Sequence, residues 1–268
     1  MNDHKFSVKN FWNSASCGED LYLSTSSRGG YMAQAKVRYE LEPYILKFID
    51  FGDIKTKKIL EIGVGLGADH QLLAQSGANL YGIDLTERAI SYTRHRFECF
   101  GLKSELTVAD AENLDFSSNI FDGVYSWGVL HHSPNTPRAI AEVWRVLKPN
   151  GVAKIMIYHK WSLVGMMLWL RYAALKFKPW LGLDHIYENY LESPGTKAYT
   201  VDEAKRLFMG FSEIKITTVL THGDLLVSEV GQRHKGVLLS LARIVWPRTI
   251  LKKFFPGLGL FMLIEVRK

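Results

Sequence analysis

The segment from Lys57 to Ile157 alternates short apolar runs with longer amphipathic stretches. This alternation is typical of a parallel β-sheet whose strands are joined by crossover helices. Thr86 is a suitable helix start, and Pro149-Asn150-Gly151 predicts a turn that ends the third helix before a strand. The expected strands are residues 58–62, 79–83, 104–109, 121–127 and 151–157, and the expected helices are about 67–76, 86–99 and 135–147.

The pattern changes after residue 157. Residues 161–175 are apolar but interrupted by Arg171, and they are shorter than the roughly 18–20 apolar residues that a membrane span needs. A buried helix, a dimer-forming helix and a membrane-touching helix all remain open for this stretch. A helix from Thr200, a strand around 212–219 and a strand within 257–268 complete the pattern.

Composition limits the class of protein. The chain has 268 residues, of which 47% are hydrophobic and 22% charged, as expected for one large globular domain rather than a disordered or fibrous protein. Cys17 and Cys99 are too few for a disulfide framework and lack metal-site spacing. We therefore expect no metal. The absence of an apolar run at the N-terminus and the low cysteine count favour a cytoplasmic location.

Positive charge is unevenly distributed. The formal net charge is +6, and residues 231–256 contain six Lys or Arg and no acid, interleaved with Leu, Ile, Val, Trp and Phe. Such a segment is either a solvated face with a core side or a peripheral contact with an anionic membrane surface. The second alternative would place the protein at the inner membrane surface.

Three glycines mark the candidate ligand site. In ILEIGVGLGADH, residues 59–70, Gly63, Gly65 and Gly67 lie at the junction of the first strand and first helix. Glycines there permit a tight turn and a close approach of ligand to backbone, and the helix start offers free N–H groups. Gly63, Gly65 and Ala68 also match the dinucleotide pattern G-x-G-x-x-A, so a nicotinamide or flavin enzyme is a second interpretation.

Three acids separate these interpretations. Glu61 lies two residues before the first glycine, where a carboxylate repels a pyrophosphate but suits a ligand with an ammonium group. Asp84 ends the second strand and can accept both hydroxyls of a ribose, whereas Asp110 ends the third and can accept from an exocyclic amine such as that of adenine. Glu61 favours a cofactor that bears an amino acid, whereas Asp84 would serve either cofactor.

These motifs resemble class I S-adenosylmethionine (SAM)-dependent methyltransferases, of the group called the type 11 methyltransferase domain. The resemblance covers roughly residues 40–158. It is carried by EIGVGLG at 61–67, GIDL at 82–85, ADAENLDF at 109–116, FDGVYSWGVLHH at 121–132 and RVLKPNG at 145–151. It implies SAM as the cofactor and S-adenosylhomocysteine (SAH) as the product.

The resemblance also assigns roles to matching positions. Gly63, Gly65 and Gly67 would line the methionine and ribose portion of SAM, and Glu61 would face its ammonium group. The remaining implied cofactor contacts are Asp84 and Leu85 at the ribose, Asp110, Ala111 and Glu112 at the adenine, and Ser126 and Trp127 at the sulfonium.

The implied fold is a doubly wound, Rossmann-like seven-stranded sheet whose last strand is antiparallel. Residues 1–40 would form an N-terminal helical lid and residues 41–268 the methyltransferase domain. Within that domain the cofactor core would span about 55–158, and insertions after strands 5 and 6, at about 159–198 and 220–256, would line the acceptor.

Four residues are candidate general bases. His131 and His132 follow the fourth strand, and Tyr158 and His159 follow the fifth, at the edge where open α/β sheets bind ligands. In-line methyl transfer needs a base only for some acceptors, so each of the four also has a purely structural interpretation. Candidate acceptor-lining residues are Tyr22, Tyr31, Trp161, Met166, Tyr187 and Tyr190.

The aromatic insertions favour a small, apolar, aromatic or lipid-like acceptor, methylated at O, N or C. The sequence leaves two other functions open. A nucleic-acid methyltransferase would use the positive charge, but the chain lacks an Asn-Pro-Pro-Tyr-like motif for a flipped base. A non-catalytic SAM-fold partner protein would not need the intact glycines and acids. We expect a monomer or homodimer.

Overall fold

The computed structural model describes residues 3–227 and 246–268. Its centre is a seven-stranded sheet in the order β3-β2-β1-β4-β5-β7-β6, in which β7 is antiparallel to both neighbours. The strands are β1 (Lys58–Ile62), β2 (Asn79–Asp84), β3 (Glu105–Val108), β4 (Phe121–Trp127), β5 (Leu147–Tyr158), β6 (Glu213–Val219) and β7 (Phe261–Arg267). This topology confirms the predicted class I methyltransferase fold.

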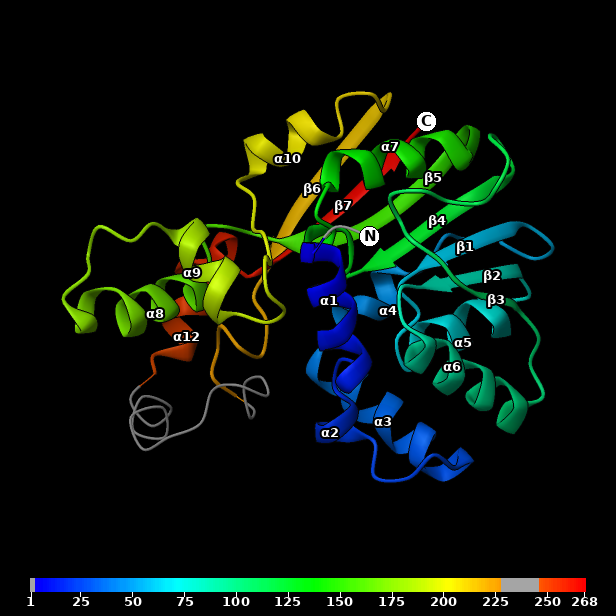
Figure 1. Ribbon diagram of the computed structural model, residues 1–268, viewed down its shortest axis with the longest axis horizontal. Helices are drawn as coiled ribbons and strands as arrows, with labels where there is room; N and C mark the ends of the chain where they lie inside the picture. The colour runs from blue at the N-terminus through cyan, green and yellow to red at the C-terminus, as the bar shows by residue number, and fades with distance from the viewer. Residues whose placement is uncertain (1–2, 228–245) are drawn as a thin grey trace.

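Helices cover both faces of the sheet (Figure 1). The crossover helices are α5 (Ala68–Gln75), α6 (Glu87–Phe100) and α7 (Thr136–Val146), and α10 (Val201–Leu207) precedes β6. The largest apolar cluster packs α7 and α10 against the central strands through side chains such as Val143 and Phe208. A second cluster, with Leu73 and Phe97, packs α5 and α6 on the opposite side.

Local signals account for the helix boundaries. The Thr86 side chain accepts from the Ala89 amide and caps α6, as its position predicted. Asn135 caps α7 in the same way, and Thr200 forms a reciprocal capping box with Glu203 at α10. These caps mark the observed starts of α6, α7 and α10, and the three predicted crossover helices differ from the observed ones by only one residue at each end.

The expected turn at 149–151 lies inside β5. The strand begins at Leu147, directly after α7, and its pairing with β4 shifts register between Phe121 and Gly123. Asn150 has φ of 65°, a left-handed conformation that Asn tolerates better than most residues. The chain thus turns sharply but continues in the same strand, which corrects the prediction that the strand starts at residue 151.

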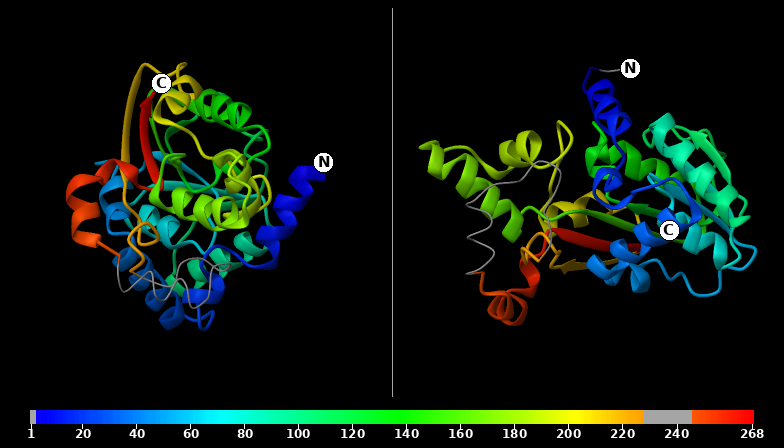
Figure 2. Two further views of the ribbon diagram at one scale, coloured as in Figure 1. Left: turned by 90° about the vertical axis from the view of Figure 1, so that its left-hand side faces the viewer. Right: turned by 90° about the horizontal axis from the view of Figure 1, so that it is seen from below.

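Two groups of additional helices stand at the carboxyl end of the parallel strands (Figures 1 and 2). The N-terminal group is α1 (Asp3–Ser14), α2 (Glu19–Tyr22), α3 (Arg28–Leu41) and α4 (Tyr44–Phe48). The second group is α8 (Leu163–Tyr172), η2 (Ala174–Lys176), α9 (Leu183–Tyr190), α12 (Arg248–Phe254) and η3 (Pro256–Leu258). The short η1 (Leu130–His132) follows β4. No helix in the described ranges is long and apolar enough to cross a membrane.

Candidate active site

The glycine loop connects β1 to α5, and its three glycines have left-handed backbone. Gly63, Gly65 and Gly67 have φ of 85°, 52° and 75°. A Cβ on Gly63 would lie 2.1 Å from Val129, and one on Gly67 would lie 2.9 Å from Thr93, so both glycines are needed for packing. A Cβ on Gly65 would meet no heavy atom within 4 Å. Gly65 therefore lies beside open space, as a ligand-facing glycine must.

Asp84 is held at the end of β2 in a defined orientation. Its Oδ1 accepts from the amide and hydroxyl of Thr86, at 3.0 and 2.8 Å, and its Oδ2 accepts from the Gly65 amide at 3.3 Å. Burial raises the pKa of Asp84, and these donors oppose that shift. The carboxylate thus lies directly beside the open space at Gly65, where the sequence predicted a ribose contact. Leu85 follows it in the same loop.

Glu61 has a partner that the sequence did not indicate. Its Oε2 lies 2.8 Å from His70 Nδ1, and the other ring nitrogen of His70 lies 2.8 Å from Ser104 Oγ. Burial lowers the pKa of His70 to about 3, so the imidazole is neutral at physiological pH. Burial and the neighbouring Asp69 raise the pKa of Glu61. A cation bound beside Glu61 would lower this pKa again.

A buried ion pair next to this group fastens the N-terminal helices to the core. Arg38 on α3 contacts both carboxylate oxygens of Asp69, at 3.0 and 2.7 Å, and the hydroxyls of Tyr39 and Tyr125 also donate to Asp69. Despite burial, these donors lower the pKa of Asp69. Asp69, in the first turn of α5, therefore anchors α3 to the core.

The adenine end of the predicted site is covered by α1. Lys5 Nζ lies 2.6 Å from both Asp110 Oδ2 and Glu112 Oε2, and the other oxygen of Asp110 accepts from the Glu112 amide. Lys9 on the same helix contacts Glu87 at 2.8 Å. Both oxygens of Asp110 therefore have donors, and a cation lies where the sequence predicted the adenine amine. Ala111 lies between the two acids and is partly buried.

The predicted sulfonium border lies at the end of β4. Ser126 is completely buried and donates to the Ile62 carbonyl at 3.1 Å. The Trp127 ring stacks with Tyr44 at 6.1 Å between centroids, and Phe261 meets it edge-on at 5.6 Å. Arg38 lies 5.9 Å from the same ring, a cation–π distance. Trp127 is thus the centre of an aromatic wall at the carboxyl end of the sheet.

Three of the four candidate bases gather next to this wall. The ring of His131 lies 4.2 Å from His132 and 4.0 Å from Tyr158 between centroids. His132 Nδ1 lies 2.9 Å from Ser193 Oγ and 3.1 Å from Thr196 Oγ1. His159 lies apart: its Nδ1 is 3.2 Å from the Gly259 carbonyl, which it holds near the start of β7.

Glu192 completes this group. The Tyr158 hydroxyl donates to Glu192 Oε2 at 2.6 Å, and His132 Nε2 lies 3.4 Å from the same oxygen. Burial and Glu192 raise the pKa of Tyr158, whereas burial and His132 hold the pKa of His131 well below its ordinary value. Among the described residues, neither ring nitrogen of His131 has a hydrogen-bond partner. We call His131, His132, Tyr158 and Glu192 the edge cluster.

The candidate acceptor-lining residues are scattered. Tyr31 and Tyr187 are completely buried; the hydroxyl of Tyr31 donates to the Tyr92 carbonyl, and that of Tyr187 to the His159 carbonyl. Trp161 and Met166 are exposed on α8 or just before it, and Tyr190 stacks on Tyr172. Tyr22 ends α2 and is partly exposed. The structure does not bring these six side chains together.

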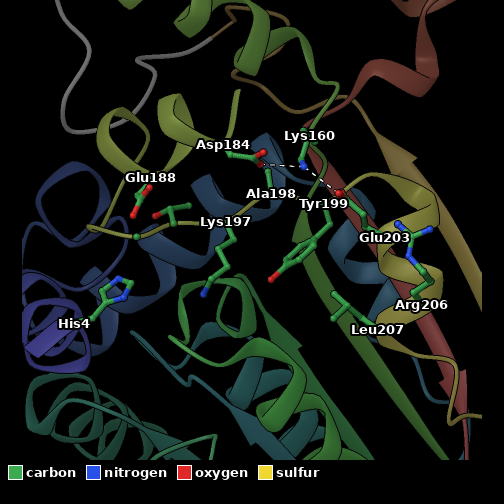
Figure 3. Close-up of a pocket in the computed structure, with 12 residues that line it drawn as sticks. His4, Lys160, Asp184, Glu188, Lys197, Ala198, Tyr199, Glu203, Arg206 and Leu207 are labelled. Carbon is green, nitrogen blue, oxygen red and sulfur yellow. Dashed lines mark hydrogen bonds and ion pairs between the residues drawn. The ribbon is translucent and has the colours of Figure 1, made fainter. Parts of the chain in front are cut away.

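A pocket is lined by residues 195–199 (Figure 3). Lys160 lines the pocket and forms ion pairs with two other lining residues, Asp184 at 3.0 Å and Glu203 at 3.2 Å. Thr196 lines this pocket and also contacts His132, so it belongs to both environments. Its other lining residues come from α1, α9 and α10 and carry both charge signs. No group of three potential metal ligands occurs in residues 3–227 and 246–268.

Comparison with known proteins agrees with this geometry. Residues 60–155 match a family model described as a methyltransferase domain. The chain is 31% identical over 136 residues to phosphoethanolamine N-methyltransferase 2 of Caenorhabditis elegans, a match that covers 50% of this chain and 29% of that protein. It is 30% identical over 138 residues to sterol 24-C-methyltransferase of Yarrowia lipolytica, covering 50% and 35%.

A solved structure has the same fold. Phosphoethanolamine N-methyltransferase 2 of Haemonchus contortus, in complex with phosphomonomethylethanolamine and SAH, aligns with a TM-score of 0.61 at 18% identity, over 98% of this chain and 60% of that one. The alignments span only about a third of the length of the two curated relatives. Residues 60–155 of the chain therefore form a methyltransferase domain, within the class I fold described above.

Proposed function

We propose that the protein transfers a methyl group from SAM to a small, largely apolar acceptor, aromatic or lipid-like in character. The observation that carries the proposal is the juxtaposition of two sites at one edge of the sheet. Gly65 and Asp84 border open space at the ends of β1 and β2, and the edge cluster lies at the ends of β4 and β5. A methyl donor and an acceptor need this adjacency, because in-line transfer depends mainly on alignment.

The residues at the glycine loop fit SAM. The cofactor supplies an activated methyl group on a sulfonium. Asp84 would accept the ribose hydroxyls, and Glu61 would balance the ammonium charge with His70 remaining neutral. Trp127 ends β4, where the resemblance places the border of the sulfonium, and its ring would line that part of the site. Calorimetric titration should show one SAM or SAH bound per chain and no binding of NAD+.

Lys5 on α1 contacts Asp110, the residue that we expect to bind the adenine amine of SAM. An adenine amine that donates to Asp110 must replace or share the position of the Lys5 ammonium. Lys5→Met should therefore lower the Kd for SAM about three- to tenfold, because the competing charge-assisted contact is lost. Fluorescence or calorimetric titration measures the shift. Lys9→Met is the matched control, since it removes an ion pair of α1 with Glu87 without touching Asp110. Weaker SAM binding by Lys5→Met would contradict a competition between the Lys5 ammonium and the adenine amine for Asp110.

The edge cluster is equipped to receive a proton from an acceptor. Glu192 is partly exposed, with 30% of its side chain accessible; the Tyr158 hydroxyl donates to its carboxylate, and His132 Nε2 lies 3.4 Å from the same oxygen. His131 is completely buried with a lowered pKa, which makes it a weak base. We therefore assign proton acceptance to Glu192, with Tyr158 and His132 as the groups that position it.

Glu192→Gln tests this assignment. The amide keeps the shape of the side chain but accepts a proton poorly, so methyl transfer to the natural acceptor should slow by about 100-fold. Because Glu192 lies away from Gly65 and Asp84, the Kd for SAH should stay within about twofold. Glu188→Gln on α9 removes the same charge from an exposed side chain and should leave the rate unchanged. A rate loss that is matched by weaker SAH binding would contradict the assignment.

Two further proposals concern location. We infer a reducing compartment, the cytoplasm, because Cys17 and Cys99 are both free thiols. The predicted membrane contact through residues 231–256 falls largely outside the described residues. Its described part, residues 246–256, includes α12 with exposed Lys252 and Lys253.

A further inference from the structure

Exposed apolar side chains are concentrated at one end of the molecule. In the described part of the chain, more than half of the exposed large apolar side chains belong to residues 161–180 and 250–255. They are Trp161, Met166, Leu170, Leu175, Phe177, Trp180, Ile250, Phe254 and Phe255. Single exposed apolar residues are ordinary on a protein surface, but such a concentration marks an interaction surface.

The two segments form one structural unit. Leu163 on α8 and Leu251 on α12 pack in the same small cluster with Leu225. Figure 1 shows α8 and α12 at the left end of the molecule, and the left panel of Figure 2 looks onto that end. We call residues 161–183 and 246–258 the apolar–basic lobe.

The tip of this lobe exposes aromatic rings that folding does not require. Phe177 is 88% exposed and Trp180 is 74% exposed. Phe177 also has φ of 57°, a left-handed conformation that bulky residues rarely adopt. A large ring held in water on a disfavoured backbone costs stability, so a partner that buries the ring is the physical reason to keep it.

The charge of the lobe identifies that partner. Residues 161–183 contain Arg171, Lys176 and Lys178, residues 246–258 contain Arg248, Lys252 and Lys253, and neither segment contains an acid. Lys176 and Lys178 flank Phe177 directly. Basic side chains around exposed Trp, Phe and Leu match an anionic lipid surface, where the rings enter the interface and the cations meet headgroups.

We propose that the apolar–basic lobe is a peripheral docking surface for an anionic lipid bilayer. The contact lies at the Phe177–Trp180 tip and along α12. It is independent of the methyltransferase proposal, because lipid binding needs neither SAM nor an acceptor. The lobe stands beyond the carboxyl end of β5, where Tyr158 of the edge cluster lies, so docking would bring the acceptor side of the sheet toward the membrane.

Flotation with lipid vesicles tests the proposal on the full-length chain. Vesicles of phosphatidylcholine with one quarter phosphatidylglycerol should carry the protein to the top of the gradient, and vesicles of phosphatidylcholine alone should carry much less. Because headgroup attraction is screened by salt, binding should fall by about tenfold or more between low and high ionic strength. Equal flotation on both vesicle types would overturn the proposal.

Paired variants locate the contact. Phe177→Ser with Trp180→Ser, and separately Lys176→Gln with Lys178→Gln, should each weaken binding by about tenfold or more. All four side chains are exposed, so the Tm should change little. Met209→Ser removes an equally exposed apolar side chain, 73% accessible, and Lys205→Gln with Lys215→Gln removes two exposed charges; both controls should bind like the unmodified protein.

Two other outcomes would overturn the proposal. In the first, the lobe variants bind anionic vesicles normally, whereas the double variant Arg233→Gln with Lys235→Gln fails to bind them. The membrane contact would then belong to residues 231–245. If the protein is a dimer by light scattering without lipid and Phe177→Ser with Trp180→Ser makes it a monomer, a second copy of the chain covers the lobe.

Discussion

Gly65→Arg should raise the Kd for SAM by about 100-fold or more, because the new side chain fills the open space beside Asp84 that the cofactor needs. The fold should survive. A Cβ at Gly65 meets no heavy atom, so the main cost is the left-handed backbone, on the order of 1–2 kcal/mol. Calorimetric titration with SAM and SAH measures the loss, and thermal unfolding measures the cost.

Gly101→Arg is the matched control for this variant. Gly101 ends α6 with φ of 64°, and a Cβ there also meets no heavy atom within 4 Å. The same substitution thus introduces the same side chain and a similar backbone cost away from the glycine loop. We expect a similar fall in Tm and unchanged SAM affinity. If Gly65→Arg binds SAM as well as Gly101→Arg does, the loop does not hold the cofactor.

Arg38→Met should lower the free energy of unfolding by about 3 kcal/mol, because it leaves the buried Asp69 carboxylate without its bidentate cation. We expect the lower end of the range for broken buried pairs, since the Tyr39 and Tyr125 hydroxyls still donate to Asp69. Urea unfolding at neutral pH measures the change. Lys36→Met, on the same helix but in an exposed pair with Glu40, should cost less than about 0.5 kcal/mol.

The Arg38 effect should depend on pH in a defined direction. The pKa of Asp69 is lowered in the folded protein, so its contribution to stability is present above the ordinary Asp pKa and is lost as pH falls through the lowered value. The difference between the unmodified protein and Arg38→Met should therefore be largest near neutral pH and shrink below about pH 4. If the difference in free energy of unfolding stays constant down to pH 3, the Arg38–Asp69 ion pair is not its source.

The sheet was predictable because its signals are local. The bounds of β1 and β4 agree with the prediction residue for residue, since each is a short apolar run between turn residues. The order of motifs along the chain also indicated which acids end adjacent strands, and Asp84 lies beside the glycine loop as expected. Local sequence patterns fix strand positions, and parallel topology then brings the strand ends to one edge.

The partners of the site residues were not predictable in this way. Lys5 and Asp110 are 105 residues apart in the sequence, and Arg38 and Asp69 are 31 residues apart. The periodicity of a helix or strand predicts contacts only between residues of the same element, so it could not indicate these pairs. Glu192 was missed because it lies after α9 in an irregular segment without periodicity. The contact between His70 and Glu61 was easier to predict, because position 70 lies on the first turn of α5 and faces back toward β1. A histidine within ten residues of an acid, on the other side of the glycine loop, is the sequence signal for this contact.

Transfer of a labelled methyl group tests the central claim most directly. The purified protein is incubated with methyl-labelled SAM and fractionated extract, and the labelled product is identified by mass. We expect label in small, organic-extractable molecules with the unmodified protein and with Gly101→Arg, and none with Gly65→Arg. Label recovered only in nucleic acid, or no transfer by a protein that binds SAM, would contradict a small-molecule methyltransferase.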